Sequence, residues 1–514
     1  MKATRDLLAG ISNSVWSALV GLAVVPFYLK YLGIEAYGLI GFFATTQALL
    51  QLLDMGLAPT INREVARYTA LGNARGVAPL LHTLSWVYWS IAAGIALLGY
   101  AFAPVVADHW LNANGLTRQA LHESVVLLAF VVACRWPIGL YQGVLMGSHR
   151  LGTASMLNML MVTLGNGGAV VILALVSPTV QAFFLWQAAV GLTYAVAMRY
   201  AAWSVIGGKI STHFDMEAIR RVWRFSAGMS GVAISAIVLM QLDKILLSKM
   251  LPLQSFGQYA LAGVVASGLY VLLTPTFNLI YPRLSALVAQ GNEAEVARLY
   301  SVGTRLLTAV LFPIAAGASV FSYELLLLWT GDAVIAANSS PVVSLFLVGT
   351  ALNGAMHFPY ALQLAYGQTR LPLQINCILL AALVPLITFL AIRYGAVGGA
   401  ASWVALNTLY LLVGTWLTHR VLLCGDGWRW LTRDVLVALA TSAFVVGGFG
   451  TLIRTLPVSA AVMLSLGAIV VVICSFGLVA ISAESRRLVA QAFFSQSTVV
   501  EPLVMLRGDQ PTRS

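Results

Sequence analysis

The chain has 514 residues, of which 60% are hydrophobic and only 9% are charged, and its formal net charge is +11. Soluble globular domains are about half apolar and one quarter charged, so this composition excludes an ordinary soluble protein and indicates a membrane protein. Most of the positive charge lies in short segments between apolar runs, which indicates orientation in a membrane rather than binding of nucleic acid. The four cysteines lack metal-ligand spacing, so neither a disulfide nor a metal site is predicted.

Apolar windows long enough to cross a bilayer occur about 14 times along the chain. The first six windows are Leu7–Leu29, Tyr37–Leu57, Leu81–Phe102, Leu121–Met146, Ser155–Val176 and Val180–Trp203. The next six are Phe225–Lys249, Tyr259–Tyr281, Ser301–Ser322, Val342–Leu364, Leu373–Arg393 and Gly398–His419. Two further windows are Val435–Ile453 and Ala460–Ile481. The sequence therefore predicts an all-α integral membrane protein.

The basic residues between the windows predict the orientation. With the N-terminus in the cytoplasm, about 22 of the 29 lysines and arginines lie on the cytoplasmic side and about 5 lie outside. The other two, Arg135 and Lys244, fall within windows. This bias follows the positive-inside rule and predicts that both termini are cytoplasmic. The first apolar run is too long for a signal peptide and has no cleavage site, so we expect it to remain as an anchor.

An internal repeat relates the two halves of the chain. A shift of 219 residues places Leu32–Leu80 over Leu251–Leu299, so that Gly38 meets Gly257 and Gly72-Asn73 meets Gly291-Asn292. Each copy is predicted to hold an outside turn, a span and a basic inside loop. Because six spans separate the copies, the repeat is parallel, with a pseudo-twofold axis along the membrane normal and a central cavity.

The repeat divides the chain into four parts. We expect an N-terminal six-helix lobe over residues 1–210 and a C-terminal six-helix lobe over residues 211–425. Two additional transmembrane helices over residues 426–482 and a cytoplasmic tail over residues 483–514 follow. Pro137 and Pro359 lie at nearly equivalent places in the fourth and tenth windows, where proline indicates either a packing kink or a hinge.

The chain lacks the sequence motifs of a nucleotide-binding loop and of a metal site. Gly208-Lys209 lacks the rest of a Walker-type phosphate loop, and the seven histidines have no metal-ligand spacing. The longest outside segments, near Ala103–Ala120 and Tyr323–Pro341, are too short for a catalytic domain. A transporter or flippase is therefore favoured over an enzyme, and no cofactor is expected.

Arg135 is the main candidate for substrate binding. It lies deep in the fourth window, where a charged side chain costs at least about 2.5–3.5 kcal/mol unless it faces protein or water. A guanidinium binds phosphate through two parallel hydrogen bonds and stays charged at any relevant pH, so Arg135 is suited to an anionic headgroup. The alternative is a structural ion pair with Glu123 or another carboxylate. Glu123 is also a possible ion-coupling residue.

Four other polar residues within the windows are weaker candidates. Asp243 and Lys244 in the seventh window either contribute to the cavity, with one of them paired laterally, or simply end the helix. Asp54 is a possible ion-coupling carboxylate, or it caps a helix or pairs with Arg63. His357 is a possible proton site, or a packing histidine that is held by hydrogen bonds.

The following segments resemble the polysaccharide transporter family of lipid-linked oligosaccharide flippases (Wzx-type), within the multidrug/oligosaccharidyl-lipid/polysaccharide exporter superfamily: Asn13, Pro26–Leu29, Tyr31–Gly38, Leu53–Leu57, Leu242–Lys244 and Trp329–Asp332. The resemblance covers nearly the whole chain, although each motif is loose. It implies two six-helix lobes that form a V, alternating access, and a cationic lumen for a glycan on undecaprenyl diphosphate. Multidrug exporters of the superfamily usually have 12 spans, which disfavours them here.

The sequence therefore predicts a flippase of the bacterial inner membrane that moves an undecaprenyl-diphosphate-linked oligosaccharide from the inner to the outer leaflet for O-antigen, capsule or exopolysaccharide synthesis. Arg63 and Arg283 are expected near the cytoplasmic gate, and a proton or sodium gradient is a possible driving force. Membrane lipids are expected partners, a polysaccharide polymerase and chain-length proteins are candidate partners, and no nucleic acid is expected. The alternatives are an ion-coupled exporter of small amphiphiles or drugs and, third, a membrane glycan polymerase or ligase.

Overall fold

The computed structural model describes residues 2–54, 56–207, 235, 237–423 and 427–481, and these residues form helices joined by short connections. No β-strand occurs in this part of the chain; its only β-type pairing is an isolated bridge between Asn112 and Pro252. Eleven of the helices are long and apolar enough to cross a membrane. The predicted all-α membrane fold is thus confirmed, whereas the number of 14 spans and the orientation of the termini stay predictions.

The N-terminal lobe is built from α1 to α7. Its elements are α1 (Lys2–Leu50), a 3-10 turn (Gln51–Asp54), α2 (Leu57–Ala70), a second 3-10 turn (Ala74–Val77), α3 (Ala78–His109), α4 (Arg118–Arg135), α5 (Ile138–Gly147), α6 (Leu151–Leu175) and α7 (Val180–Ile206). The first two predicted spans are joined in α1, which bends at Gly33 because this residue has a φ of 78°. The fourth predicted span is divided into α4 and α5 at Trp136-Pro137.

The C-terminal lobe begins with a helical segment over residues 237–250. It continues with α9 (Leu253–Ser267), α10 (Tyr270–Ala289), α11 (Glu293–Val320), α12 (Ser322–Thr330), α13 (Ala333–Ala355), α14 (His357–Ala365) and α15 (Arg370–Val421). Residues 225–234 and 236 of the seventh predicted span, Phe225–Lys249, lie outside the described residues. The last two spans of this lobe are joined in α15, which bends at Gly395, where φ is 60°.

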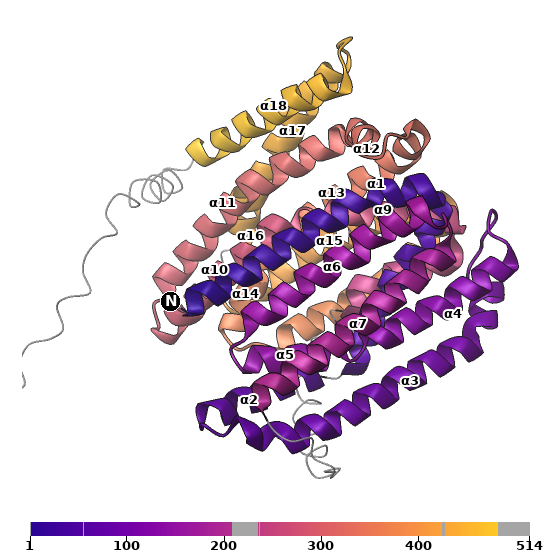
Figure 1. Cartoon of the computed structure of the whole chain (residues 1–514). Helices are drawn as coiled ribbons and strands as arrows, with labels where there is room; N and C mark the ends of the chain where they lie inside the picture. Colours follow the sequence, from indigo (N-terminus) through magenta and orange to yellow (C-terminus); the bar gives the residue numbers. More distant parts are fainter. Residues whose placement is uncertain (1, 55, 208–234, 236, 424–426, 482–514) are drawn as a thin grey trace, which may run out of the picture.

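The additional C-terminal pair packs on the outside of the C-terminal lobe. It consists of α16 (Gly427–Trp430), a π-helical segment (Leu431–Leu436), α17 (Val437–Arg454) and α18 (Ala460–Ile481). Both long helices run beside α11 (Figure 1). The predicted cytoplasmic tail, residues 483–514, lies outside the described part of the chain.

Two connections predicted as loops contain helices. The basic inside segment after the second window forms α2, which buries Leu57, Ile61 and Val65 at four-residue spacing. Arginine and glutamate between these positions hide the apolar face from a search for continuous apolar runs. The outside segment near Tyr323–Pro341 likewise contains α12 and the start of α13.

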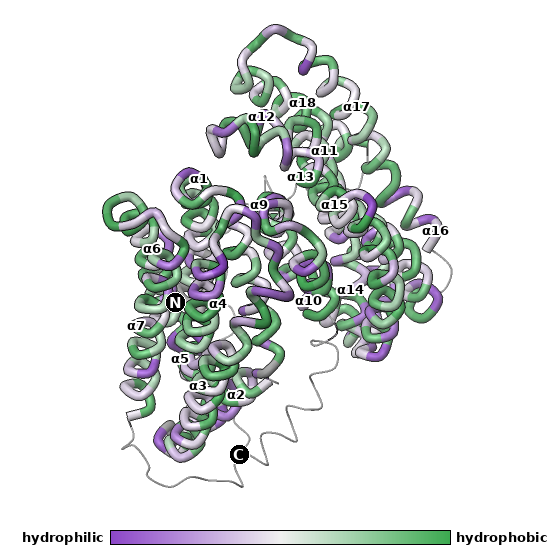
Figure 2. The backbone as a smooth tube through the Cα atoms, turned by 90° about the vertical axis from the view of Figure 1, so that its right-hand side faces the viewer, coloured by the Kyte–Doolittle hydropathy of each residue, from purple (hydrophilic) through white to green (hydrophobic). Residues whose placement is uncertain are grey.

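The two lobes meet through equivalent surfaces of α1 and α9 (Figure 2). A Cβ atom on Gly38 would overlap the carbonyl oxygen of Leu253, and a Cβ atom on Gly257 would overlap that of Ile34. The repeat places Gly38 over Gly257 and Ile34 over Leu253, so each contact is the symmetry mate of the other. Such a reciprocal contact is typical of a twofold interface.

Equivalent helix ends extend this correspondence beyond the contact. The shift of 219 residues relates the end of α2 at Ala70 to the end of α10 at Ala289. It also relates the start of α6 at Leu151 to the start of α15 at Arg370. Gly72 and Gly291, which the repeat aligns, both adopt a positive φ, of 70° and 68°. The repeat found in the sequence thus corresponds to a repeat of backbone structure.

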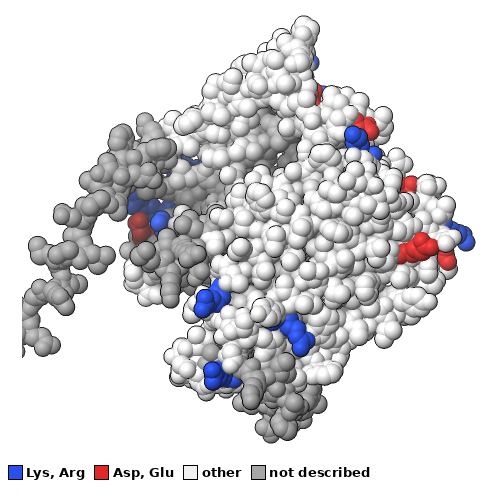
Figure 3. Space-filling view, viewed as in Figure 1, with Lys and Arg blue, Asp and Glu red and all other residues white. Residues whose placement is uncertain are grey.

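The outer surface is apolar where lipid would cover it. Large apolar side chains such as Leu175, Phe444 and Phe476 are more than 70% exposed. Charged side chains on the face shown in Figure 3 lie near its two ends, with a broad uncharged band between them. This distribution is expected for helices that are solvated by hydrocarbon over their middle and by water at their ends.

Candidate functional site

A cavity of about 700 Å³ lies within the N-terminal lobe. The residues that line it come mainly from the 3-10 turn over Gln51–Asp54 and from α2, α4, α5, α6 and α7, with single residues from α1 and α3 and Ile237. Its polar lining residues include Gln47, Gln51, Asp54, Thr60, Tyr88, Arg135, Gln142, Asn158, Asn166, Gln187 and Tyr194. A cavity of this size, with polar side chains in a largely apolar lining, is large enough for part of an amphiphilic substrate.

Arg135 lies in this cavity at the break between α4 and α5. Its Nη2 atom donates a hydrogen bond of 2.5 Å to Oε1 of Gln187, and Nη1 donates one of 3.4 Å to Oε1 of Gln47. The guanidinium carbon lies 5.4 Å from the ring centre of Phe43. Among the described residues no carboxylate forms an ion pair with Arg135. Neutral amides and an aromatic ring therefore hold its charge without cancelling it.

The backbone places Arg135 by ending α4 at this position. Trp136 and Pro137 separate α4 from α5, and Pro137 precedes the first residue of α5. A proline removes a helical hydrogen bond and favours such a break. The C-terminal lobe is broken at the equivalent place, between α13 and α14, where Met356 precedes His357. Both lobes thus carry a cationic or titratable side chain beside a helix break in mid-span.

Glu123 is not in the cavity. Its carboxylate is exposed near the start of α4 and accepts hydrogen bonds from Gln119 at 2.9 Å and Gln181 at 3.3 Å. Twelve residues of helix separate Glu123 from Arg135, which corresponds to about 18 Å along the axis. The structure therefore does not bring these two residues together.

Asp54 lies at the cavity edge, where α1 passes into α2. Its carboxylate accepts a hydrogen bond from the hydroxyl of Tyr88 and one of 3.2 Å from the backbone nitrogen of Ala58. The second bond satisfies one of the unpaired nitrogens at the start of α2. Arg63, the predicted alternative partner, forms no ion pair with Asp54. Asp54 thus combines a capping contact with exposure to the cavity.

Amide side chains are the part of the site that the sequence search missed. The amide of Asn158 on α6 donates a 2.8 Å hydrogen bond to Asn13 and accepts one of 3.1 Å from Tyr194. The amide of Gln187 also donates to the backbone oxygen of Gly165 at 3.3 Å. Asparagine and glutamine are costly within apolar spans unless they are paired or face a polar space. Their presence at these positions is the signal that would have found them.

A second, smaller cavity of about 270 Å³ lies in the C-terminal lobe and has an aromatic lining. His357, Tyr360, Trp403 and Tyr410 contribute to it, together with Asn353, Asn376 and Asn407. Phe277 stacks on Tyr360 with ring centres 5.8 Å apart. The Nδ1 atom of His357 lies 3.4 Å from the backbone oxygen of Asn353. His357 therefore lines a cavity whose other described lining residues include no cationic side chain and no carboxylate.

Asp243 and Lys244 form a pair within the helical segment over residues 237–250. The Nζ atom of Lys244 lies 3.4 Å from Oδ1 of Asp243 and donates a 3.0 Å hydrogen bond to the backbone oxygen of Met240. Oδ2 of the buried Asp243 accepts a 2.6 Å hydrogen bond from Tyr259. Neither residue belongs to the lining of either cavity described above. The geometry thus assigns these two residues contacts within the C-terminal lobe.

The two predicted gate arginines are exposed residues on α2 and α10. Arg63 and Arg283 line neither of these cavities. Figure 2 shows α2 and α10 in different parts of the molecule, whereas α1 and α9 are in contact. No group of three or more potential metal ligands occurs among the described residues.

Solved structures of membrane transporters share this fold. The lipid II flippase MurJ in an inward closed conformation superposes with a TM-score of 0.66 at 12% identity, covering 96% of this chain and 99% of its own. A multidrug resistance transporter of the MATE family, in an inward-facing conformation, gives 0.64 at 14% identity, covering 79% of this chain and 94% of its own. The fold is therefore that of a multi-pass membrane transporter.

The family follows from the sequence comparison. Residues 4–288, more than half of the chain, match the family of polysaccharide biosynthesis proteins, and the chain belongs to this family. A Shigella flexneri protein assigned as an O-antigen transporter is 22% identical over 422 residues, which are 80% of this chain and 98% of the relative. The protein is thus a transporter of the bacterial inner membrane rather than an enzyme, of the lipid-linked polysaccharide flippase or exporter type.

Proposed function

We propose that the protein flips an undecaprenyl-diphosphate-linked oligosaccharide from the inner to the outer leaflet by alternating access, for O-antigen, capsule or exopolysaccharide synthesis. The observation that carries this proposal is the environment of Arg135. A permanently charged side chain lies in mid-span, lines a cavity of about 700 Å³ and is held only by uncharged partners. An uncompensated cation within the membrane costs free energy, and an anion that enters the cavity would offset this cost. Arg135 is therefore suited to binding an anionic substrate group.

The diphosphate is the part of the substrate that Arg135 would bind. A guanidinium that hydrogen-bonds with two nitrogens matches the paired oxygens of a phosphate. Gln187, which is buried, and Gln47 hold the guanidinium plane in place. The other amides of the cavity offer donors and acceptors for sugar hydroxyls, so charge and hydroxyl recognition lie in the same cavity.

The aromatic cavity of the C-terminal lobe would contact the sugar rings. Tyr360, Trp403 and Tyr410 present ring faces together with asparagine amides. Apolar faces of sugar rings pack well on aromatic rings, while amides bind their hydroxyls. This division assigns the anion to the N-terminal lobe and the neutral glycan to both lobes.

The contacts between the lobes support entry from the cytoplasmic leaflet. Besides the glycine contact, Nε1 of Trp110 donates a 3.0 Å hydrogen bond to Ser248, and Nε1 of Trp329 donates one of 3.2 Å to the backbone oxygen of Leu22. The glycine contact and the Trp110–Ser248 hydrogen bond lie near the predicted outer end of the spans. The lining of the N-terminal cavity extends through Asp54, Pro59 and Thr60 toward the predicted inner end. Lobes that are in contact at the outer end of the spans, with a cavity that extends toward the inner end, form the state that would receive a lipid-linked substrate.

An ion-coupled exporter of small amphiphiles or drugs is the second candidate function, and two observations favour it. The MATE-family structure has almost the same TM-score as the flippase, and Asp54 offers a carboxylate at the cavity. Its match, however, leaves about one fifth of this chain uncovered, whereas the flippase match covers 96%. Export of a cationic dye driven by an imposed proton or sodium gradient, with no effect on glycan output, would identify the exporter.

The third candidate, a glycan polymerase or ligase, has no counterpart among these matches, which are transporters and flippases.

Replacing Arg135 tests the flippase proposal. We expect Arg135→Ala to reduce surface polysaccharide at least roughly tenfold, since a charged hydrogen-bonded pair is worth about 1.5–3 kcal/mol. Arg135→Lys should restore only part of it because an ammonium lacks the paired geometry. Arg393→Ala is the matched control, since Arg393 is exposed on α15 and contacts Tyr394.

Surface polysaccharide, membrane level of the protein and lipid-linked glycan on the cytoplasmic face would be measured for each variant. Cytoplasmic-face accumulation with normal protein level is the expected result for Arg135→Ala. Wild-type polysaccharide output from this variant would disprove the assigned role. The proposed polymerase and chain-length partners would be tested separately by co-purification with the protein from the native membrane.

A further inference from the structure

Two tryptophans that the repeat aligns each contact the opposite lobe. The shift of 219 residues places Trp110, which follows α3, over Trp329 near the end of α12. Nε1 of Trp110 donates a 3.0 Å hydrogen bond to the hydroxyl of Ser248. Nε1 of Trp329 donates one of 3.2 Å to the backbone oxygen of Leu22 in α1. Each indole thus binds to the first predicted span of the other lobe.

The backbone oxygen of Leu22 is released from its usual helical hydrogen bond by Pro26, which lies inside α1. In an α-helix the oxygen of residue 22 accepts from the nitrogen of residue 26, and a proline nitrogen has no hydrogen to donate. A backbone oxygen without a donor is costly within a membrane, so a neighbouring helix commonly supplies one. Here the donor is the indole of Trp329 from the opposite lobe.

The two indole contacts lie at different depths. The repeat aligns Ser248 with Leu29, which is seven residues nearer than Leu22 to the outer bend at Gly33. Seven residues correspond to about 10 Å along a helix. The contact at Leu22 is therefore the deeper of the two, where water replaces a lost hydrogen bond less readily. At the place of Pro26 the second copy has Ile245, so the repeat does not reproduce the released oxygen.

The segment that carries Trp329 is fixed by the ends of two helices. Gly331, with a φ of 70°, ends α12 directly after Thr330. Oδ1 of Asp332 then accepts hydrogen bonds of 2.8 and 3.0 Å from two backbone nitrogens in the first turn of α13. Both helices belong to the C-terminal lobe, so the indole moves with that lobe.

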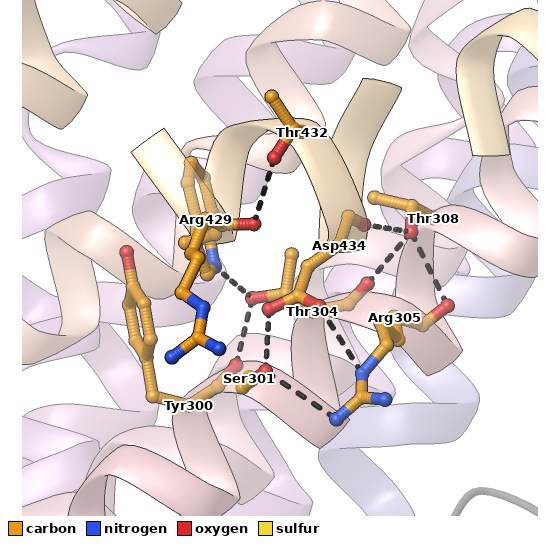
Figure 4. Close-up of polar contacts among 9 residues, drawn as sticks. Tyr300, Ser301, Thr304, Arg305, Thr308, Arg429, Thr432 and Asp434 are labelled. Carbon is orange, nitrogen blue, oxygen red and sulfur yellow. Dashed lines mark hydrogen bonds and ion pairs between the residues drawn. The ribbon is translucent and has the colours of Figure 1, made fainter. Parts of the chain in front are cut away.

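Polar contacts inside one lobe need not change when the lobes move as rigid bodies. Figure 4 shows such a group, in which Asp434 joins the segment before α17 to α11. Nε of Arg305 lies 3.2 Å from Oδ1 of Asp434, and the hydroxyl of Thr308 donates a 2.8 Å hydrogen bond to the backbone oxygen of Asp434. The indole of Trp329 joins the two lobes instead, so separation of the lobes at this level breaks its hydrogen bond.

We propose that Trp329 and the backbone oxygen of Leu22 form a lock that favours the state in which the lobes are closed on the outer side. This inference rests on the alternating access of the proposed function. Closure supplies the oxygen with a donor in place of the one that Pro26 removes, and opening takes this donor away. The lock therefore stabilises the closed state alone and sets how often the outer side opens.

Labelling of a reporter thiol measures this opening. Ser248→Cys, in a chain whose native cysteines are replaced by serine, places the thiol at a site that is 1% exposed and is covered by Trp110 of the opposite lobe. The purified full-length protein in lipid nanodiscs would be treated with a hydrophilic maleimide. When the lobes close faster than the thiol reacts, the labelling rate follows the open population. Because the closed state loses one neutral hydrogen bond, Trp329→Phe should raise the rate roughly two- to tenfold.

Pro26→Ala tests whether the proline creates the lock. An alanine nitrogen would donate to the oxygen of Leu22 in both states, so closure would gain less from Trp329. We expect Pro26→Ala to raise the labelling rate of the reporter protein and to add nothing when Trp329→Phe is already present. An equal rise in both backgrounds would mean that the proline acts through the helix itself and would overturn the proposal. An unchanged rate for Trp329→Phe would overturn it as well.

Trp16→Phe is the matched control. Trp16 also lies on α1, but its Nε1 donates a 2.9 Å hydrogen bond to Thr163 of the same lobe, so its loss should leave the labelling rate unchanged. A rise equal to that of Trp329→Phe would contradict a lock between the lobes. The labelling contains no substrate, so it does not depend on the role of Arg135. Normal polysaccharide output from Arg135→Ala and an unchanged labelling rate from Trp329→Phe are therefore separate failures.

Discussion

The two lobes share a backbone repeat but differ in the chemistry of their cavities. The N-terminal cavity contains Arg135 and several amides, whereas the C-terminal cavity is lined by aromatic rings, asparagines and His357. Equivalent helix breaks in mid-span carry Arg135 in one lobe and His357 in the other. The comparison teaches that the repeat preserves the backbone frame, whereas the side chains beside the two helix breaks differ between the lobes.

The largest expected effect comes from disturbing what the lobes share. Gly257→Leu would force a side chain into the carbonyl oxygen of Ile34, so the contact between α1 and α9 must open. Overpacking of this kind costs about 1–3 kcal/mol. We expect nearly complete loss of flipping and a lower midpoint of thermal unfolding for the purified protein.

Gly263→Leu is the matched control for this prediction. Gly263 lies on the same helix, and an added Cβ atom there would meet no other heavy atom within 4 Å. Flipping and thermal stability of this variant should stay close to the wild type. Equal behaviour of the two leucine variants would contradict the close glycine contact.

An intermediate effect is expected in the aromatic cavity of the C-terminal lobe, which we propose to contact the glycan. Tyr360→Ala removes a ring that lines the aromatic cavity and stacks on Phe277. Because an aromatic contact contributes about 0.5–1.5 kcal/mol beyond its buried area, flipping of the full lipid-linked oligosaccharide should fall roughly five- to tenfold. Tyr360→Phe should retain most activity, and Tyr394→Ala, an exposed ring at the bend of α15, should have little effect.

The measurement for Tyr360 uses two lipids in proteoliposomes. Flipping of the oligosaccharide-bearing lipid would be compared with flipping of the same polyprenyl diphosphate carrying a single sugar. Only the longer glycan should respond strongly to the loss of the ring. An equal reduction for both lipids would mean that the aromatic cavity acts on something other than the distal sugars.

The smallest effect on basal flipping is expected at Asp54, which the repeat aligns with the buried Leu273. Asp54→Asn keeps the acceptor oxygen for Ala58 but cannot titrate, so basal flipping should change by roughly twofold or less. Any stimulation by an imposed proton or sodium gradient should disappear. Glu123→Gln, at the exposed start of α4, should keep that stimulation, and a gradient response that survives Asp54→Asn but not Glu123→Gln would assign coupling to Glu123 instead.

The sequence predicted the frame of the fold because its signals are local. Within the described residues the apolar windows of membrane length are largely helical, since hydrocarbon imposes helical hydrogen bonding on each span. The breaks inside some windows, such as the one between α4 and α5, were not predicted. The repeat was readable because turns such as Gly72 and Gly291 need a positive φ, which keeps glycine at both places. Helix α2 was not predicted because its apolar residues recur at helical spacing with charged and polar residues between them.

The site was only partly predictable because its contacts join distant positions. Arg135 stood out as a charge within an apolar window, but its partners Gln47 and Gln187 are 88 and 52 residues away. Their place within apolar windows marks them as candidates, but the sequence does not show that they meet Arg135. Asp243 attracted attention for the same reason as Arg135, yet the structure buries it against Tyr259, 16 residues further on. A charged residue within an apolar window is thus a candidate for the site, because it is costly there unless it is paired. Only the packed structure shows which of these residues are paired.

The glycine contact between α1 and α9 has a consequence for the origin of the molecule. Each half contributes the same surface, so one half would meet a second copy of itself through the same two glycines and the same two carbonyl oxygens. That is the form of interface found in homodimers. The boundary between the lobes therefore has the form of a former subunit interface, and joining both copies in one chain would have allowed one wall to become cationic and the other aromatic.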